Sequence, residues 1–392
     1  MWWPEETREK KFAVYPLSGD PVHNGHVQSL ASAVNTGFFD KVYFAMGKNS
    51  KKNYLFSLDE RLELAKKSVY SAGVDPSKVI IEPFSGLLRN YARRIGADFV
   101  VRGSRNAQDF DYEMTLADFN AEYGLQTVIL PAAEGNRTTS SSMVKAVVSE
   151  GGMVDKYVHP AVKQALEERM NNVSLVGVTG NMGAGKSTFC GGLVDHLRAQ
   201  GKDAHHIDFD KLIQAQYTGN SPVNLEVREQ IKKNFGRVVF DGDVLNKKKL
   251  ARRVFRDPDK MEQLSETLRA PALMGIEDSV REMKGVVLLD AAYLTKYGLL
   301  SVVNYNAILV GCDEDERLSR VSKRDGLSEE ETKIRFQAQQ PQDLKKKLIL
   351  QGQEKFDHGF LYEVDTTGEV DYGAAMKELE KYFPLFKSEA SE

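Results

Sequence analysis

The residues that could do chemistry in this chain gather in two short loops. "GDPVHNGHVQ", residues 19–28, places His23 and His26 around Gly25, directly after the apolar run "KFAVYP". "GNMGAGKS", residues 180–187, matches the phosphate-binding pattern G-x-x-x-x-G-K-S. Imidazoles and the free N–H groups of a helix start can hold phosphate oxygens, and a lysine can neutralise their charge. Both loops therefore indicate phosphate chemistry.

In the first loop, a helix that begins near Gly25 would point its free N–H groups and the positive end of its dipole at an anion. His23 and His26 would flank that anion. They could stabilise the charge that develops on an α-phosphate in the transition state, without a covalent intermediate. The alternative is structural: His23 as a plain loop residue and His26 as a solvated residue of the first helical turn.

Further cations and hydroxyls follow other expected strands of the same half. Lys51 and Lys52 follow the second strand, and Arg102 and Arg105 follow the fourth. Because the carboxyl ends of parallel strands share one edge of a sheet, these side chains should face the same ligand, although each pair alone is compatible with solvated surface. Three successive hydroxyls at a later helix start add donors, of which one would suffice as a cap: Ser140, Ser141 and Ser142.

Short β-branched runs alternate with segments of helical periodicity, and this alternation predicts a doubly wound α/β fold with a parallel sheet. The expected strands of the first half are 12–15, 41–46, 78–82, 98–102 and 127–131. Ser57 and Glu60 have the spacing of a capping box and predict a helix start. The strand-then-helix pattern restarts after Asn171 and Asn172, so two domains are expected, at residues 12–170 and 173–386.

Composition narrows the class of protein. The chain has 392 residues and a formal net charge of -3, so it lacks the cationic excess typical of nucleic-acid binders. Cys190 and Cys312 are too few for a disulfide framework, which favours a reducing compartment and a cytoplasmic protein. "MWWPEETREKK" is unlike a secretory signal, and no run approaches the roughly 20 apolar residues of a membrane span. Small-molecule substrates are therefore expected, with the oligomeric state left open and a homo-oligomer compatible.

The second loop follows the apolar stretch 174–179 and precedes the helical stretch 188–197, which is the context that a phosphate-binding P-loop requires. Its N–H groups would surround a β-phosphate, Lys186 would reach the β- and γ-oxygens, and Ser187 would bind magnesium. The residues expected to bind ATP here are Gly180, Asn181, Met182, Gly183, Ala184, Gly185, Lys186, Ser187 and Thr188.

Three carboxylates are expected beside this loop. Asp208 and Asp210 end the next strand-like stretch, and Asp290 ends a later apolar run, as a Walker-B acid would. One can accept a hydroxyl proton and another can position magnesium, although one of the first two is also placed to cap a helix. A later helical segment predicts a lid over the ATP phosphates, with Arg324 as the expected contact among its cations: Arg317, Arg320, Lys323, Arg324 and Arg335.

Residues 12 to about 168 resemble bacterial-type phosphopantetheine adenylyltransferases through "YPLSGDPVHNGH", "SKKNYLFSLDER", "FSGLLRNYAR", "VVRGSRNAQDFDYEMTLADFN" and "TSSSMVK". The resemblance implies a Rossmann-like domain that joins ATP to 4'-phosphopantetheine and releases pyrophosphate. It implies that His26 stabilises the transition state, with Lys51 and Arg102 beside the acceptor. The implied contacts to phosphopantetheine are Ser18, Lys51, Leu87, Arg102 and Asn120, and those to ATP are Ser18, His23, Gly25, Arg105, Glu113, Ser140, Ser141 and Ser142.

Two features depart from that family, a three-residue stretch and a single position. The family usually reads Gly-Thr-Phe where this chain has Leu17, Ser18 and Gly19, and it has threonine where this chain has His23. A histidine there is commoner in nicotinamide or nicotinate mononucleotide adenylyltransferases. The stretch "RGSRNAQDFDYEM" opposes that alternative, because it is similar to the pantetheine enzymes.

Residues 174 to about 385 resemble dephospho-CoA kinases through "GVTGNMGAGKST", "HIDFDKL", "LLDAAYL" and "SKRDGLSEEE", and they are similar to the kinase half of eukaryotic bifunctional CoA synthases at "DAAYL" and "RDGLSE". This implies a P-loop kinase domain with helical CoA-binding and lid segments. Asp210 would be the base for the ribose 3'-hydroxyl, with Asp208 and Asp290 on the dephospho-CoA side. Ala270 and Gln342 stand where relatives have a histidine and a lid arginine.

Together the two resemblances imply consecutive steps of coenzyme A synthesis, with ATP as substrate and magnesium as cofactor at both sites. Two alternatives remain open at this point. One is an adenylyltransferase joined to a riboside kinase of NAD salvage, favoured by His23. The other is a CoA- or nucleotide-binding regulator with an inactive kinase half, suggested by Ala270 and Gln342.

Overall fold

The computed structural model of the chain describes residues 10–49, 51–132, 135, 138–254, 257–296, 298–326, 328–337 and 339–383. The chain divides into unit 1, Met1–Val147 with Val154–Lys163, and unit 2, Val148–Met153 with Gln164–Glu392. The boundary expected at 171–172 falls inside unit 2, because Gln164 and Glu167 accept hydrogen bonds from the side chains of Asn306 and Asn304. The expected end at residue 386 lies outside the described residues.

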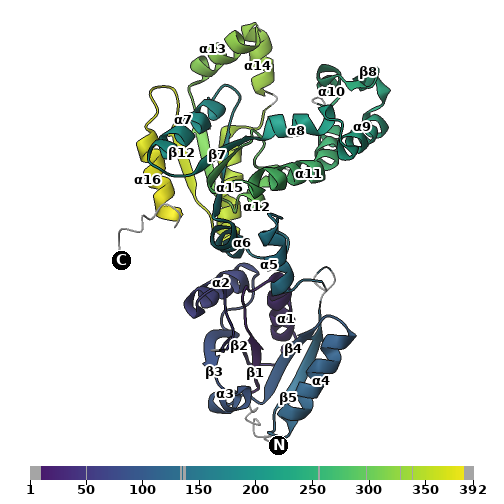
Figure 1. Ribbon diagram of the computed structural model, residues 1–392, viewed down its shortest axis with the longest axis vertical. Helices are drawn as coiled ribbons and strands as arrows, with labels where there is room; N and C mark the ends of the chain where they lie inside the picture. The colour runs from purple at the N-terminus through teal and green to yellow at the C-terminus, as the bar shows by residue number, and fades with distance from the viewer. Residues whose placement is uncertain are drawn as a thin grey trace, which may run out of the picture. The chain divides into compact units, whose positions relative to one another are not determined.

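Unit 1 contains a five-stranded parallel sheet in the order β3-β2-β1-β4-β5 (Figure 1). All five strands coincide with runs expected from the sequence: β1 (Phe12–Leu17), β2 (Lys41–Lys48), β3 (Val79–Ser85), β4 (Phe99–Ser104) and β5 (Gln126–Pro131). The strand order reverses at β1, which lies between β2 and β4. In open parallel sheets such a switch point is where ligands bind, beyond the carboxyl ends of the strands.

The helices of unit 1 connect successive strands and pack against the sheet. The capping box at Ser57 is confirmed, since Ser57 Oγ accepts from Glu60 N and the Glu60 carboxylate accepts from Ser57 N. The buried strand residues Val14, Ala45 and Val100 form the centre of one core cluster. The helices are α1 (Asn24–Asn35), α2 (Leu58–Ser71), α3 (Leu88–Ile95), α4 (Ala107–Ala121) and, at the end of the unit, α5 (Ser141–Ser149) and α6 (Pro160–Leu166), whose last residues are assigned to unit 2.

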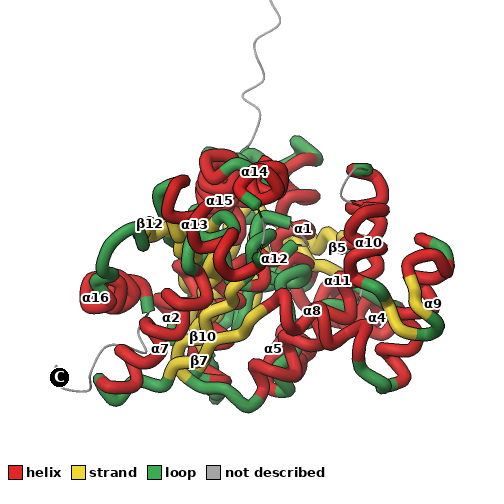
Figure 2. The backbone as a smooth tube through the Cα atoms, turned by 90° about the horizontal axis from the view of Figure 1, so that it is seen from above, coloured by secondary structure: helices red, strands yellow, loops and turns green. Residues whose placement is uncertain are grey.

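Unit 2 is built on a second five-stranded parallel sheet, in the order β12-β11-β6-β10-β7. Figure 2 shows two of its strands, β7 and β10, running side by side. β6 lies at the centre, so the loop that follows it emerges in the middle of the carboxyl edge. The strands are β6 (Val173–Gly180), β7 (Ala204–Asp208), β10 (Gly285–Asp290), β11 (Ala307–Gly311) and β12 (Leu361–Asp365).

Two groups of elements in unit 2 lie beside the sheet, apart from the other helices of the unit. A helical group with its own apolar core contains α8 (Phe209–Thr218), α9 (Pro222–Phe235), a 3-10 turn (Arg237–Val239), β8 (Phe240–Asp241), β9 (Val244–Leu245), α10 (Lys247–Val254) and α11 (Pro258–Arg281). A pair of short helices, α13 (Glu314–Asp325) and α14 (Glu329–Gln337), stands apart from it (Figure 1). The other helices are a π-helix (Glu167–Asn171), α7 (Lys186–Ala199), α12 (Leu299–Val302), α15 (Gln342–Phe356) and α16 (Tyr372–Tyr382).

The expected fold class is confirmed, because both units are α/β structures with parallel sheets. Among the described helices, none is both long enough and apolar enough to cross a bilayer.

Candidate active sites

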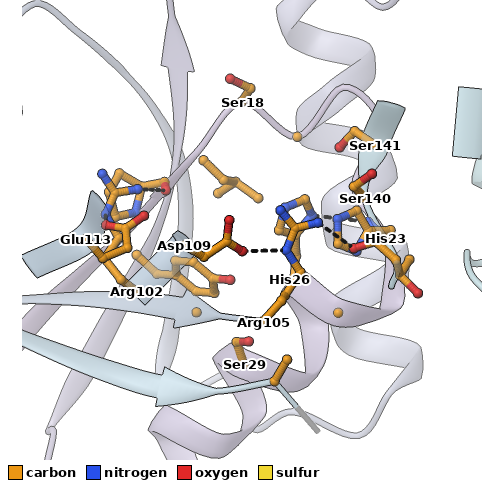
Figure 3. A pocket seen from close by; sticks show the side chains of 18 of the residues that line it. Ser18, His23, His26, Ser29, Arg102, Arg105, Asp109, Glu113, Ser140 and Ser141 are labelled. Atoms are coloured by element: carbon orange, nitrogen blue, oxygen red, sulfur yellow. Dashed lines mark hydrogen bonds and ion pairs between the residues drawn. The ribbon is translucent and has the colours of Figure 1, made fainter. Parts of the chain in front are cut away.

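A cavity of about 500 Å³ opens at the carboxyl ends of β1 and β4 in unit 1 (Figure 3). This is the switch point of the sheet, where the fold places a ligand. The cavity is lined by His26 and Arg102 and by all of the residues expected to bind ATP in this unit: Ser18, His23, Gly25, Arg105, Glu113, Ser140, Ser141 and Ser142.

His23 and His26 stack face to face beside the cavity, with ring centroids 3.6 Å apart. The backbone N–H of His23 donates to Nδ1 of His26 over 3.3 Å. Burial lowers the pKa of His23 to about 4, with a contribution from the nearby Arg105. Burial, then His23 and Arg105, lower the pKa of His26 well below 6.5. Both rings are therefore neutral at pH 7 and can donate ring N–H groups to an anion.

Asp20 fixes the loop that carries the histidines. Its two carboxylate oxygens accept the backbone N–H groups of Leu55 and Phe56, each over 3.0 Å, and Lys145 pairs with it at 3.1 Å. Asp20 thus ties the loop after β1 to the loop after β2 and to α5. The sequence pattern did not reveal this residue, because its partners lie far away in the chain.

Arg61 supports the same loop from below. The side chain is 2% exposed, stacks on the ring of Tyr54 at 3.9 Å, and donates through Nη1 to the carbonyls of Ser18 and Gly47. A buried guanidinium must find acceptors, and here they are the backbone at the ends of β1 and β2. The capping box predicted the start of α2, which carries Arg61, but no sequence pattern marked the arginine.

The cations on the far side of the cavity are held by carboxylates from α4. Arg102 pairs with Glu113 at 3.1 Å and donates to the carbonyl of Pro16, whereas Arg105 pairs with Asp109 at 2.8 Å (Figure 3). Burial raises the pKa of Glu113, although Arg102 acts in the opposite direction. Arg105 precedes α4 and Asp109 lies in its first turn, and no sequence pattern predicted that the two would pair.

A second cavity of about 520 Å³ shares part of this lining and extends toward Tyr54 and Phe84. The lysine in both linings is Lys52, whose Nζ donates to Ser18 Oγ over 3.3 Å. Lys51, the lysine proposed from the sequence, is exposed and lines neither cavity.

Two further residues expected beside phosphopantetheine also lie outside both linings. Leu87 is 52% exposed and precedes α3, next to Gly86, which does line the second cavity. Asn120 is buried in the last turn of α4, where its carbonyl accepts from Tyr123 and Leu125. Their roles stay predictions.

In unit 2, the loop between β6 and α7 has the expected P-loop form. α7 begins at Lys186, and Gly183 and Gly185 adopt φ of +80° and +78°, which side-chain-bearing residues rarely do. A Cβ on Gly180 would lie 2.3 Å from the carbonyl oxygen of Val310. Glycine is therefore required at these positions, and the N–H groups at the start of α7 are left to face an anion.

Ser187 and Asp290 meet beside this loop. Ser187 Oγ donates to Asp290 Oδ2 over 2.6 Å, and the Lys186 ammonium donates to the carbonyl of Asn181 over 3.4 Å. Burial alone would raise the pKa of Asp290, but His206, Ser187 and Lys186 outweigh it, so that pKa is lowered. A hydroxyl and an ionised carboxylate in contact are the hard oxygen ligands that magnesium takes, so these residues fit the ion.

The two carboxylates after β7 divide into a cap and a candidate base. Asp208 is the N-cap of α8 and accepts from Lys211 N over 3.0 Å, which is the capping role considered for one of the pair. Asp210 lies in the first turn of α8. Burial raises the pKa of Asp210, and Asp208 and Asp290 raise it further, while Lys186 lowers it. A raised pKa suits a carboxylate that must accept a proton.

The arginine beside the P-loop is Arg317. Its Nε donates to the carbonyl of Met182 over 3.1 Å, and its guanidinium stacks on Phe336 at 4.3 Å. Arg324, the expected ATP contact, pairs with Asp325 at 2.8 Å and is largely exposed. Arg320 donates to Thr366, whose hydroxyl in turn donates to the carbonyl of Ala184.

Two residues unmarked by any motif also contact the P-loop. Gln339 accepts from the backbone N–H of Met182 over 2.9 Å, and the buried Lys345 donates to the carbonyl of Gly180 over 3.0 Å. Burial, then Lys186 and Arg317, lower the pKa of Lys345 to about 7.

Comparison with known proteins agrees with both sites. Residues 18–147 match the cytidylyltransferase-like family model, and residues 174–350 match the dephospho-CoA kinase model. Unit 1 is 43% identical over 158 residues to the phosphopantetheine adenylyltransferase of Renibacterium salmoninarum, covering 40% of this chain and 95% of that protein. The same enzyme of Pseudarthrobacter chlorophenolicus is 42% identical over 156 residues, covering 39% and 90%, and that of Bartonella quintana is 42% identical over 161 residues, covering 40% and 91%.

The cytidylyltransferase-like match, residues 18–147, includes His26, Arg102 and the start of α5, and the kinase match, residues 174–350, includes the P-loop, Asp210 and Asp290. The two matches do not overlap in the chain. The chain therefore belongs to the phosphopantetheine adenylyltransferase family, joined in one polypeptide to a dephospho-CoA kinase domain.

Proposed function

We propose that the chain is a bifunctional CoA synthase, with one reaction in each unit. The observation that carries the proposal is the presence of two separate phosphate sites, at the loop after β1 and at the P-loop after β6. The families matched by the two units catalyse consecutive steps, so one chain would make dephospho-CoA and then use it.

In unit 1, the phosphate of 4'-phosphopantetheine attacks the α-phosphorus of ATP. A P–O bond forms to the acceptor, the bond to the β-phosphate oxygen breaks, and pyrophosphate leaves. The acceptor phosphate is already anionic at neutral pH, so no protein base is needed. We assign His26, with His23 beside it, to donating hydrogen bonds to the α-phosphate as its charge grows.

The rest of the first cavity would bind the two substrates. Arg105, Glu113 and the serines at the start of α5 lie on the ATP side, while Arg102 and Ser18 lie between the two cavities. Lys52 is the lysine positioned for the acceptor phosphate, since it lines both cavities and already donates to Ser18. For Lys51 to contact the acceptor phosphate instead, the loop after β2 would have to shift by one residue, so that Lys51 takes the place of Lys52.

In unit 2, the ribose 3'-hydroxyl of dephospho-CoA attacks the γ-phosphorus of ATP. Asp210 accepts the hydroxyl proton, a P–O bond forms to the 3'-oxygen, and ADP leaves. The N–H groups of the P-loop and the Lys186 ammonium hold the β- and γ-phosphates. Arg317 is placed to neutralise phosphate charge, because it already contacts the loop at Met182.

Magnesium, when bound, supplies positive charge to the phosphate oxygens and would be held by Ser187 and Asp290. Those two residues keep the oxygen ligands together before any ion arrives. In unit 1 an ion would enter with the triphosphate.

Small molecules are the proposed partners, and the cytoplasm is the proposed location. Cys190 and Cys312 are both free thiols, which supports a reducing compartment. The relatives of unit 1 are phosphopantetheine adenylyltransferases, which favours this acceptor over nicotinamide mononucleotide. The intact P-loop with Ser187, Asp290 and Asp210 favours an active kinase over a regulator.

The test is mass spectrometry of the products that purified protein forms from ATP, magnesium and 4'-phosphopantetheine. CoA, pyrophosphate and ADP are expected, with dephospho-CoA as an intermediate. A parallel reaction with nicotinamide mononucleotide should give no dinucleotide. If dephospho-CoA accumulates and no CoA forms, the proposed kinase activity of unit 2 is wrong. If a dinucleotide forms from nicotinamide mononucleotide, the proposed acceptor of unit 1 is wrong.

A further inference from the structure

Behind the P-loop, three side chains that can bind metals converge between α7, β7 and β10. One ligand atom each of Cys190, His206 and Asp290 lies within 4.8 Å of the other two. Cys190 comes from α7, His206 from β7 and Asp290 from β10. None of the nucleotide-binding roles proposed above uses the thiol or the imidazole.

The register of the sheet explains why the three groups meet. β7 and β10 pair so that His206 is opposite Leu288 and Asp208 is opposite Asp290. Because strand side chains alternate between faces, His206 and Asp290 share the face whose apolar residues pack under α7. Cys190 lies on the buried side of α7 with Phe189 and Leu193, so it points onto that face.

The imidazole is not satisfied within this arrangement. Nε2 of His206 is buried and makes no hydrogen bond within the described residues; its one recorded contact is the 3.6 Å ion pair with Asp290 Oδ2, through which it lowers the pKa of Asp290. A buried ring nitrogen without a partner is costly, and a metal ion is one of the groups that would satisfy it. The surrounding core offers the thiol and the carboxylate as the other two ligands.

We propose that Cys190, His206 and Asp290 form a binding site for Zn²⁺ or a similar thiophilic divalent cation. Thiolate, imidazole and carboxylate together are a zinc ligand set, whereas magnesium avoids sulfur. Three protein ligands leave one position, which water or Ser187 can fill. Burial raises the pKa of the Cys190 thiol, so zinc must displace its proton, and binding releases H⁺.

Occupancy of this site would inhibit the kinase step. Asp290 is the carboxylate held against Ser187, and a zinc ion that binds it removes a ligand from the proposed magnesium site. The adenylyltransferase step uses residues of unit 1 only and would continue. This consequence rests on the proposed function, but metal binding itself does not.

Binding is tested with the full-length protein and metal alone. Wild-type protein should bind one Zn²⁺ in calorimetry and should give a thiolate-to-metal charge-transfer band with Co²⁺. Cys190→Ala and His206→Gln should each weaken zinc binding by at least about 10–100-fold, because mutating a residue that only hydrogen-bonds to a metal ligand already causes a loss of this size. Cys312→Ala is the matched control, because it removes the chain's other free thiol and should bind as wild type.

Equal zinc affinity in wild type and both site variants, or a charge-transfer band that persists in Cys190→Ala, would overturn the site. If Cys190→Ala disturbs the core, its kinase rate without zinc will fall. The zinc affinity of His206→Gln then tests the site in its place.

Inhibition is tested by ADP formation from dephospho-CoA with excess magnesium. Zinc should inhibit wild type and Cys312→Ala, and Cys190→Ala should need about tenfold more zinc or higher. Equal zinc sensitivity in all three proteins would overturn the inhibitory role, because zinc would then act on ATP itself. A wild-type protein without any kinase activity would contradict the proposed function, while the cobalt spectrum would still test the site.

Discussion

His23 and His26 are kept uncharged by the same burial that places them against the nucleotide cavity. Neutral imidazoles bind an anion more weakly than imidazolium ions, but they donate hydrogen bonds without first losing a charged, hydrated state. Negative charge on bound ATP would raise both pKa values, so the pair becomes more cationic only when the substrate is present.

The titration of His23 follows from this. In the nucleotide-free protein, NMR titration of the imidazole should give a pKa of about 4, and ATP should raise it. Because the folded-state pKa lies below that of the unfolded chain, protonation favours unfolding as the pH falls below about 6.5. The cost for His23 reaches about 3 kcal/mol below pH 4. His23→Gln should lack this acid sensitivity, and a pKa near 6.5 without nucleotide would contradict the account.

Lys345 shows a similar coupling in unit 2. It is 2% exposed, lies beside Lys186 and Arg317, and has a pKa of about 7. Bound triphosphate favours its charged form, so ATP must bring a proton with it above pH 7. The affinity of wild-type protein for MgATP should therefore fall as the pH rises from 7 to 8, by up to about tenfold.

Lys345→Met should remove that component of the pH dependence and bind MgATP more weakly at pH 6.5. Lys347→Met, on the exposed side of the same helix, is the control and should behave as wild type. Isothermal titration of MgATP at several pH values measures both. A pH dependence that is unchanged in Lys345→Met would show that another group carries it.

At the scale of elements, each site is a strand, a tight loop and a helix start. The loop after β1 turns at Gly19, which has φ of +59° and whose added Cβ would lie 2.5 Å from the sulfur of Met46. Gly19→Ala should therefore lower the free energy of unfolding of unit 1 by about 1–2 kcal/mol and reduce adenylyl transfer. Gly37→Ala has a similar φ but open space around it, so it should keep full activity. Equal adenylyl transfer by the two variants would show that the turn at Gly19 is not needed for catalysis.

Helix geometry places Arg324, the arginine expected to contact ATP, away from the P-loop in this structure. Arg317 and Arg324 lie seven residues apart on α13, which corresponds to about 10 Å along the axis. The P-loop is adjacent to Arg317, at the start of the helix, while Arg324 at its end pairs with Asp325. The sequence shows that a helix is rich in arginine, but the docking of the helix decides which arginine reaches the loop.

Sequence patterns were equally unable to show which loop residues face the cavities. Lys51 and Lys52 differ by one residue, and only the turn after β2 determines that Lys52 lines the cavities. Asp20 and Arg61 act through backbone groups far away in the sequence, so no local pattern marks them. In contrast, the strands and the capping box at Ser57 follow from local periodicity and spacing, and both were confirmed. The P-loop sequence lies between a strand and a helix, as expected.

At the scale of the whole molecule, each unit contains a complete set of groups for its own reaction. The residues that line the first cavity belong to unit 1, and those around the P-loop belong to unit 2. Among the described residues, the side chains named at each site come from a single unit, so loss of one activity should leave the other intact.

The most direct test of this claim is complementation between two inactive variants. His26→Ala should lose adenylyl transfer by about 100-fold or more, and Asp210→Asn should lose phosphorylation by a similar factor, while each keeps the other step. CoA formation from phosphopantetheine should be low with either variant alone and should return when the two proteins are mixed. If a single substitution abolishes both steps, or if the mixture makes no CoA, the two sites do not work independently and the account is wrong.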